Sequence, residues 1–185
     1  TVRACPVRGG TVASFDASKV TDMPGVQKVV QIEDYAVAVV ADTWWRAKKA
    51  MDALPIEWDE GENASVNQAD IVARIDEGLD ADEAFIGNEA GDADGALAGA
   101  AKRVEAVYGY PFLNHATMEP QTAVAKWTED RCEVWCPTQN GEAALAAVSE
   151  ASELPIEQCE VYKQLLGGGF GRRGATDYVR QAVLL

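Results

Sequence analysis

Short apolar runs separated by turn residues predict a small α+β unit over residues 1–60. The run at Tyr35–Ala41 is apolar almost throughout, which indicates a strand that is covered on both faces. Asp42 or Thr43 is placed to cap a helix that Pro55 ends. The predicted elements of this unit are two strands within Val2–Phe15, strands at Val26–Ile32, Tyr35–Ala41 and Ile56–Trp58, and a helix at Trp44–Leu54.

Three tryptophans, Trp44, Trp45 and Trp58, lie close together in the sequence of this unit. A stacking surface for a flat ligand is one interpretation. However, a buried aromatic side chain removes about 150–250 Å² from water and dominates the packing of a small core. We therefore expect the three tryptophans to lie in the hydrophobic core.

Beyond residue 60 the pattern changes twice. Residues 61–100 are predicted to be an acidic linker with short helices, because between Glu57 and Asp94 thirteen Asp and Glu residues accompany the single base Arg74. From residue 101 the periodicity of apolar side chains returns. The predicted strands of the whole stretch are Lys102–Phe112, Thr122–Trp127, Cys132–Cys136 and Ile156–Leu166, and the predicted helices are Ala69–Gly78, Asn140–Glu153 and Thr176–Leu185.

Composition excludes several classes of partner. A formal net charge of −14 disfavours nucleic acid and anionic membrane surfaces, since both are bound mainly through Lys and Arg. No apolar run approaches the roughly 20 residues that a membrane-spanning helix needs. The four cysteines form no CxxC pair, and with the single histidine, His115, they match neither a zinc site nor a disulfide framework. Both ends of the chain fall within patterned sequence, so we expect a piece of a longer protein.

The stretch Leu165–Asp177, LLGGGFGRRGATD, gathers five glycines around Phe170 and the basic pair Arg172–Arg173. Glycine lets a ligand approach the main chain closely, at a cost of about 0.5–1 kcal/mol per residue inside regular structure, so a binding loop is favoured over a simple turn. A glycine loop between a strand and a helix is typical of phosphate-binding sites. Gly169 to Gly174 also matches the dinucleotide motif G-x-G-x-x-G, so a nucleotide-binding module is an alternative.

Three segments, in this order and spacing, resemble the molybdenum-binding subunit of the xanthine dehydrogenase and aldehyde oxidase family. They are NHATMEPQTAVAKW at 114–127, CEVWCPTQN at 132–140 and LLGGGFGRRGATDYVRQA at 165–182. The double-arginine form GGGFGRR and the run VVADTWWRAKKAMDALPIEWDEG at 39–61 are most similar to the branch of this family that contains the isoquinoline 1-oxidoreductase β-subunit.

This resemblance implies an α+β fold of mixed sheets with flanking helices. An α/β hammerhead-like domain at 1–60 would precede the acidic linker at 61–100 and the truncated N-terminal part of a molybdopterin-binding domain at 101–185. Family members use molybdenum held by a pterin dithiolene to hydroxylate aldehydes or N-heterocycles with an oxygen from water.

For the intact parent, the resemblance implies a molybdenum–pterin dinucleotide, with the cytosine dinucleotide favoured, and an iron–sulfur subunit as partner. It also implies a bacterial periplasmic or cytoplasmic location, with the periplasm favoured. This chain alone is expected to lack the cofactor and to be inactive.

The resemblance also assigns a cofactor site. Gln139 matches the family glutamine that hydrogen-bonds near a molybdenum oxygen ligand, and Phe170 and Gly171 match the pair that lies over the metal. No residue of this chain is expected to ligate the metal or to act as the general base, because the base glutamate lies near the far C-terminus of the full subunit. The residues expected to bind the cofactor are Gln139, Gly168, Gly169, Phe170, Gly171 and Arg172.

Several alternatives stay open. Gly174 stands where xanthine-oxidising members have a substrate-binding glutamate, which disfavours purine recognition. His115 and Glu119 are spaced as an acid/base pair could be, but we expect them to hold a turn by hydrogen bonds. Arg172 and Arg173 are suited either to pterin phosphate or to pairing with acidic groups. A non-catalytic interaction domain is a further alternative to an enzyme.

Overall fold

The computed structural model describes residues 1–83 and 85–185 and contains two compact units. The first unit comprises Thr1–Ala64 and Asn114–Leu185, and the second comprises Ser65–Leu113. Small sheets with flanking helices build the first unit, which confirms the predicted fold class. The predicted domain boundaries at residues 60 and 100 stay a prediction. None of the helices in the described ranges is long and apolar enough to cross a membrane.

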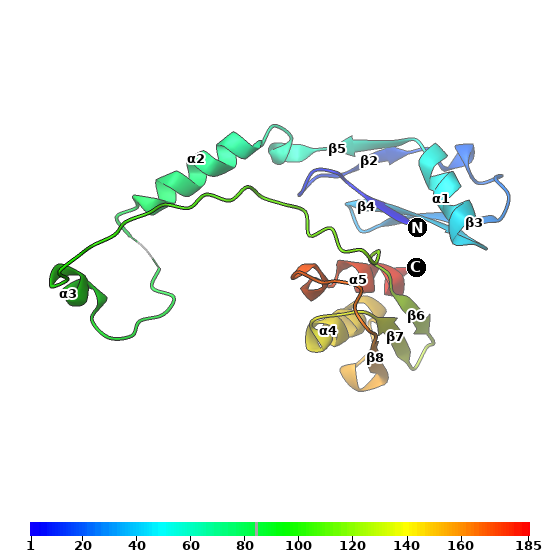
Figure 1. The fold of residues 1–185 in the computed structure, drawn as a ribbon. Coiled ribbons are helices and arrows are strands. Elements are labelled where there is room, and N and C mark those ends of the chain that lie inside the picture. The colour runs from blue at the N-terminus through cyan, green and yellow to red at the C-terminus, as the bar shows by residue number, and fades with distance from the viewer. Residues whose placement is uncertain (84) are drawn as a thin grey trace. The chain divides into compact units, whose positions relative to one another are not determined.

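An antiparallel sheet with strand order β1-β4-β3 begins the first unit (Figure 1). Its central strand is covered on both faces, as predicted: Val37 and Val39 belong to a core cluster with helix α1, and Ala36 and Ala38 to a second cluster on the other side. β2 and β5 form a separate antiparallel pair. The bounds are β1 (Val2–Ala4), β2 (Thr11–Phe15), β3 (Val26–Ile32), β4 (Ala36–Ala41), α1 (Trp44–Ala53) and β5 (Ile56–Asp59).

The tryptophan prediction is wrong for two of its three residues. The side chains of Trp44 and Trp45 are 66% and 57% exposed, and only Trp58 is half-buried. Two alanines and Met51 form the face of α1 that meets the sheet. These small or flexible side chains let the helix approach the sheet closely, which leaves the indoles of its first turn outside. Trp45 instead packs beneath the Lys49 ammonium, 5.1 Å from the ring centroid.

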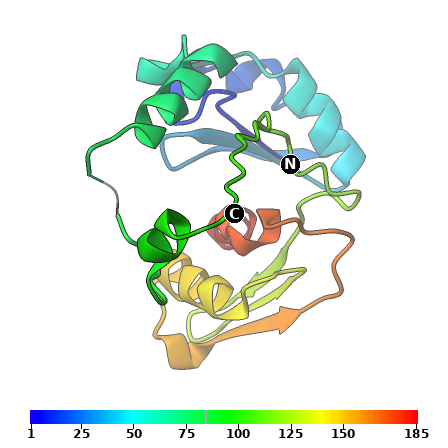
Figure 2. The same ribbon diagram turned by 60° about the vertical axis from the view of Figure 1, so that its left-hand side comes forward.

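A second sheet, β6-β7-β8, forms the other part of the first unit, with β6 antiparallel and β8 parallel to the central strand β7. Helix α4 connects the two parallel strands, and α4 and α5 pack against the same face of the sheet (Figure 2). The bounds are β6 (Val124–Trp127), β7 (Cys132–Cys136), α4 (Gly141–Ser152), β8 (Cys159–Lys163) and α5 (Asp177–Leu184). The core of this layer consists of Cys132, Val134, Cys136, Ala144, Val148, Tyr178 and Val179.

Two details of this layer bear on the sequence predictions. Cys132 and Cys136 lie on one face of β7, as predicted, and burial raises the pKa of both thiols. β8 is shorter than the predicted strand at Ile156–Leu166. Residues Ile156–Gln158 form a 3-10 turn after Pro155 instead, so only the middle of the predicted strand pairs with β7.

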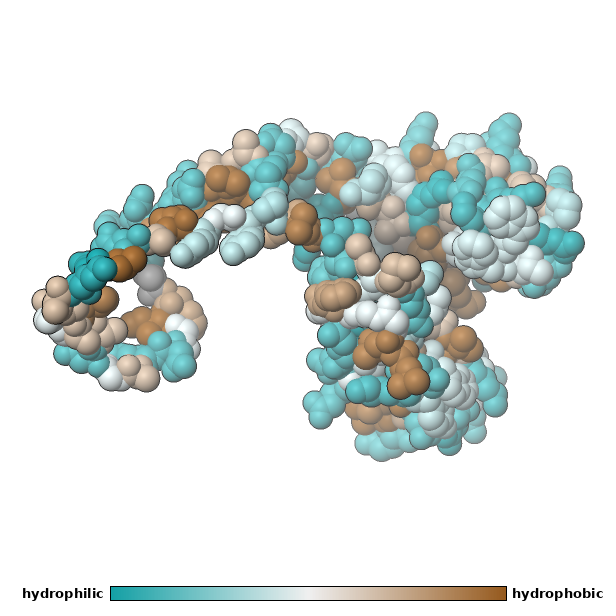
Figure 3. All heavy atoms as spheres, viewed as in Figure 1, coloured by the Kyte–Doolittle hydropathy of each residue, from teal (hydrophilic) through white to brown (hydrophobic). Residues whose placement is uncertain are grey.

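The second unit contains α2 (Gln68–Leu79) and α3 (Ala93–Ala98). Asn67 and Asp70 cap the N-terminus of α2 with a capping box. This helix was predicted from the sequence. The predicted strand at Lys102–Phe112 is wrong, because these residues lack a paired strand within the described part of the chain and all are exposed. Apolar side chains therefore remain on the surface of this unit (Figure 3). They include Val104, Val107, Tyr108, Tyr110, Phe112 and Leu113.

Candidate functional site

The glycine-rich loop connects the end of β8 to the start of α5. Its backbone is in the left-handed region at Gly168, Phe170 and Gly171, with φ of 100°, 53° and 89°. Left-handed backbone costs a non-glycine residue roughly 1–2 kcal/mol, so Phe170 is held in an unfavourable conformation. Such strain is concentrated at ligand-binding sites. The Phe170 side chain is 74% exposed, which leaves a large apolar group at the surface of the loop.

Gln139 contacts this loop, whereas its predicted contact with the cofactor stays a prediction. It lies between β7 and α4, where the side chain of Asn140 caps the helix by accepting a hydrogen bond from Ala143 N at 3.0 Å. The Gln139 Oε1 atom accepts hydrogen bonds from the amides of Gly171 and Arg173, both at 3.2 Å. The structure thus brings two motifs that are more than 30 positions apart in the sequence into direct contact.

Three successive main-chain donors of the loop stay available. The amides of Gly167 and Gly171 on either side donate to Glu119 and Gln139. In the described ranges, by contrast, we find no acceptor for the N–H groups of Gly168, Gly169 and Phe170. Consecutive free amides in left-handed and turn backbone form a concave surface that attracts anions.

Glu119 and Arg173 anchor the loop. The sequence left Arg173 between pterin phosphate and an acidic partner, and it placed Glu119 in a turn and not at the site. The Glu119 carboxylate accepts from Gly167 N at 2.9 Å and pairs with the Arg173 guanidinium at 2.7 Å. Arg173 is fully buried. The sequence predicted that Glu119 and His115 hold a turn together by hydrogen bonds. Glu119 instead holds the glycine loop, and His115 is exposed. A contact across 54 positions leaves no local pattern in the sequence that could have revealed it.

Arg172 forms a bidentate pair with Asp177, with N–O distances of 2.8 and 2.7 Å. These hydrogen bonds raise the pKa of Arg172. Burial alone would raise the pKa of the Asp177 carboxyl, but the hydrogen bonds and charge of Arg172 outweigh burial and hold that pKa below its ordinary value. Since Arg173 pairs with Glu119, the structure pairs both arginines with carboxylates. A contact of Arg172 with a cofactor stays a prediction.

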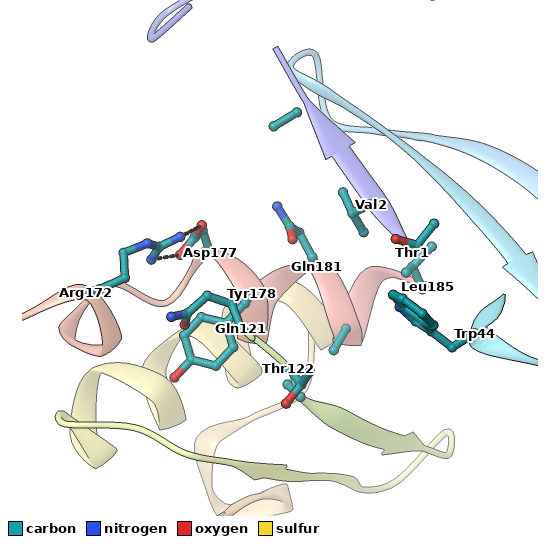
Figure 4. Close-up of a pocket in the computed structure, with 13 residues that line it drawn as sticks. Thr1, Val2, Trp44, Gln121, Thr122, Arg172, Asp177, Tyr178, Gln181 and Leu185 are labelled. Atoms are coloured by element: carbon teal, nitrogen blue, oxygen red, sulfur yellow. Dashed lines mark hydrogen bonds and ion pairs between the residues drawn. The ribbon is translucent and has the colours of Figure 1, made fainter. Parts of the chain in front are cut away.

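A hollow of about 480 Å³ adjoins α5 in the first unit. Arg172 lines it and faces Asp177, while Gln181, Thr1 and Trp44 line other parts of its wall (Figure 4). Gln139 and the glycines of the loop are not among its lining residues. The candidate site is therefore the exposed surface of the loop beside Gln139, and the hollow is a separate feature that shares only Arg172 with it.

The groups of the loop fit an anionic ligand that is recognised through the main chain. A Cβ atom added at Gly169 would lie 2.7 Å from the Gln139 side chain, and one at Gly167 would lie 2.4 Å from Glu119 Cβ. Only glycine therefore allows the loop to pack this closely on its supports. With both arginines paired with carboxylates, the free amides and the Gln139 Nε2 group remain as donors, and the amides add no side-chain bulk.

Comparison with known proteins gives this site its context. Residues 78–185 match the family model described as the molybdopterin cofactor-binding domain. The chain is 29% identical over 177 residues to one of the subunits of the nicotinate dehydrogenase of Pseudomonas putida, covering 96% of this chain and 15% of that protein. It is also 29% identical over 184 residues to the membrane-bound aldehyde dehydrogenase [pyrroloquinoline-quinone] of Gluconacetobacter polyoxogenes, covering 95% of this chain and 24% of that protein.

A solved structure shows the same fold. The quinoline 2-oxidoreductase of Pseudomonas putida 86 superposes with a TM-score of 0.61 at 20% identity, covering 94% of this chain and 27% of that one. The chain thus spans a quarter or less of the length of the two sequence relatives. It belongs to the molybdopterin cofactor-binding domain family and corresponds to a part of the molybdenum-binding subunits of xanthine dehydrogenases and aldehyde oxidoreductases.

Proposed function

We propose that this chain forms part of the molybdenum-binding large subunit of a bacterial-type molybdenum hydroxylase. The observation that carries the proposal is the contact of Gln139 with the glycine loop, in which the amides of Gly168, Gly169 and Phe170 have no acceptor in the described part of the chain. When bound, the molybdenum–pterin cofactor supplies the two-electron oxidation in which an oxygen atom from water enters the substrate.

The residues of this chain hold and orient that group. Free main-chain donors bind its anionic periphery, and the absence of a Cβ on the glycines lets it come close. The Gln139 carbonyl oxygen accepts hydrogen bonds from the loop, so its Nε2 group is the part of the amide that would donate to the bound cofactor. The exposed ring of Phe170 is available to shield the cofactor from water when it is bound. None of the described side chains is assigned as the proton acceptor, and we propose that the chain alone is inactive.

We extend the proposal to the form of the cofactor and to the parent's partners. A cytosine dinucleotide is favoured, an iron–sulfur subunit accepts the electrons, and the parent acts in the bacterial periplasm or cytoplasm, with the periplasm favoured. Arg172 now pairs with Asp177, and it would release this carboxylate to bind a pterin phosphate. Aldehydes or N-heterocycles are the substrate class, in keeping with the names of the two relatives. Gly174 offers no side chain for purine recognition.

Metal and cofactor analysis of the intact parent tests this function. The parent is purified with its partner subunits, molybdenum is quantified by mass spectrometry, and the released pterin and nucleotide are identified by chromatography. Molybdenum, pterin and cytidine monophosphate are expected. An active parent that contains a quinone and no molybdenum, as the name of the Gluconacetobacter relative would suggest for that protein, contradicts the proposal.

A further inference from the structure

The fully buried side chain of Arg173 lies beneath the glycine loop and has no part in the proposed function so far. Its Nε atom donates to the Gly168 carbonyl at 2.7 Å. Its Nη2 atom donates to the Glu119 carbonyl at 2.8 Å and pairs with the Glu119 carboxylate at 2.7 Å. The planar guanidinium therefore joins the loop to the segment that carries Glu119, with donors in directions that a single ammonium cannot reproduce.

The main chain of the same residue holds Gln139. Arg173 N donates to Gln139 Oε1 at 3.2 Å, and Gln139 N donates to the Arg173 carbonyl at 3.1 Å. The buried Thr138 hydroxyl also donates to that carbonyl, at 3.2 Å. Arg173 is consequently the joint at which the glycine loop, the Glu119 segment and the Gln139 segment meet.

One atom of the guanidinium is not used in these contacts. Within the part of the chain that is described, Nη1 is buried without a hydrogen-bond partner. Unsatisfied buried donors are rare and cost stability. Because the chain itself covers Nη1, a ligand on the loop does not touch it. Arg173 therefore acts on a ligand through the groups that it holds.

We propose that Arg173 is a positioning residue of the cofactor site, an inference that rests on the proposed function. With Glu119 as its anchor, it fixes the loop so that the free amides point together. It also fixes Gln139, because the hydrogen bonds from Gly171 and Arg173 occupy Oε1 and leave Nε2 as the group offered to the cofactor.

The test compares Arg173→Lys with Arg180→Lys in the intact parent with its partner subunits. Arg180 is a matched control because it also joins separate elements, pairing with Glu33 at 2.7 Å and Glu150 at 3.2 Å without touching the loop. Arg173→Lys is expected to speed hydrogen exchange of residues 167–173 about tenfold or more, the change expected for the loss of a hydrogen bond to a charged group. It is also expected to alter the electron paramagnetic resonance spectrum of the bound molybdenum and to lower kcat more than it changes KM. Arg180→Lys leaves all three unchanged.

A double variant separates positioning from folding. Arg173→Met leaves the half-buried Glu119 carboxylate without its ion-pair partner, so the melting temperature is expected to fall. Arg173→Met with Glu119→Leu removes both charges and is expected to recover part of that fall. If Arg173 is a positioning residue, hydrogen exchange of residues 167–173 and the electron paramagnetic resonance spectrum of molybdenum stay altered in this double variant. Wild-type loop exchange and a wild-type spectrum in Arg173→Lys or in the double variant, in a parent that contains molybdenum, overturn this inference alone. A wild-type parent without molybdenum overturns the proposed function and this inference with it.

Discussion

Substitution of Gly169 by alanine acts directly on Gln139. The added Cβ would lie 2.7 Å from both Gln139 Cδ and Oε1, closer than a real Cβ approaches another atom, whereas φ at this position is not left-handed. The clash therefore falls on a flexible side chain and not on the backbone. Relief requires the Gln139 amide to move away from the loop, which breaks the hydrogen bonds that it accepts from Gly171 and Arg173.

The size of this effect follows from those two hydrogen bonds. Each contributes about 0.5–1.5 kcal/mol, so their loss costs about 1–3 kcal/mol and raises local hydrogen exchange about 5-fold to 150-fold. Exchange of residues 165–176 in the intact parent, followed by mass spectrometry, measures the change, and molybdenum content is expected to fall with it. Gly174→Ala is the matched control, because its Cβ meets no described atom within 4 Å. Equal exchange in the two variants would refute the role of Gln139 as a support of the loop.

Three further predictions concern other parts of the structure. Gly171→Ala has open space for its Cβ but a φ of 89°, so strain of about 1–2 kcal/mol is expected to lower the melting temperature and the molybdenum content; wild-type values for both contradict it. Because the pKa of Asp177 is lower in the folded state, its pair with Arg172 contributes stability above about pH 4 that is lost as the pH falls through the folded pKa. Melting curves from about pH 6 to pH 3 should show that loss in the wild type and less of it in Asp177→Asn, and parallel curves contradict the assignment. Thr43→Ala removes the cap bond to Arg46 N and is expected to cost α1 about 1 kcal/mol, seen as faster exchange of its first turn, whereas unchanged exchange contradicts it.

Local physical chemistry explains what the sequence predicted well. Thr43 and Asn140 begin helices because their side chains accept hydrogen bonds from first-turn amides, and such caps are visible as residue types before an apolar period. The alternation of Cys132, Val134 and Cys136 predicts a strand with one buried face for the same kind of reason. The family resemblance assigned Gln139 and the loop to one cofactor site, but the hydrogen bonds between them were not predicted.

The features that the sequence did not predict depend on contacts between residues that are far apart in the chain. Glu119 and Arg173 form an ion pair although they are far apart in the sequence, and no local pattern predicts such a pair. The sequence therefore left two interpretations of Arg173 open. Trp44 was assigned to the core by size, whereas burial on α1 is decided by which helix face fits the sheet. The alternation at Lys102–Phe112 predicted a strand, but a strand also needs a partner, and the described part of its unit contains none.

The most direct measurement is a crystal structure of the intact parent with its cofactor, in which anomalous scattering at the molybdenum absorption edge locates the metal. The anomalous peak is expected beside Gln139 and the Phe170–Gly171 pair, with cofactor atoms within hydrogen-bond distance of the amides of Gly168 and Gly169. A peak elsewhere in the protein, with these amides facing only solvent or another segment of chain, would contradict the assignment of this loop as a cofactor site.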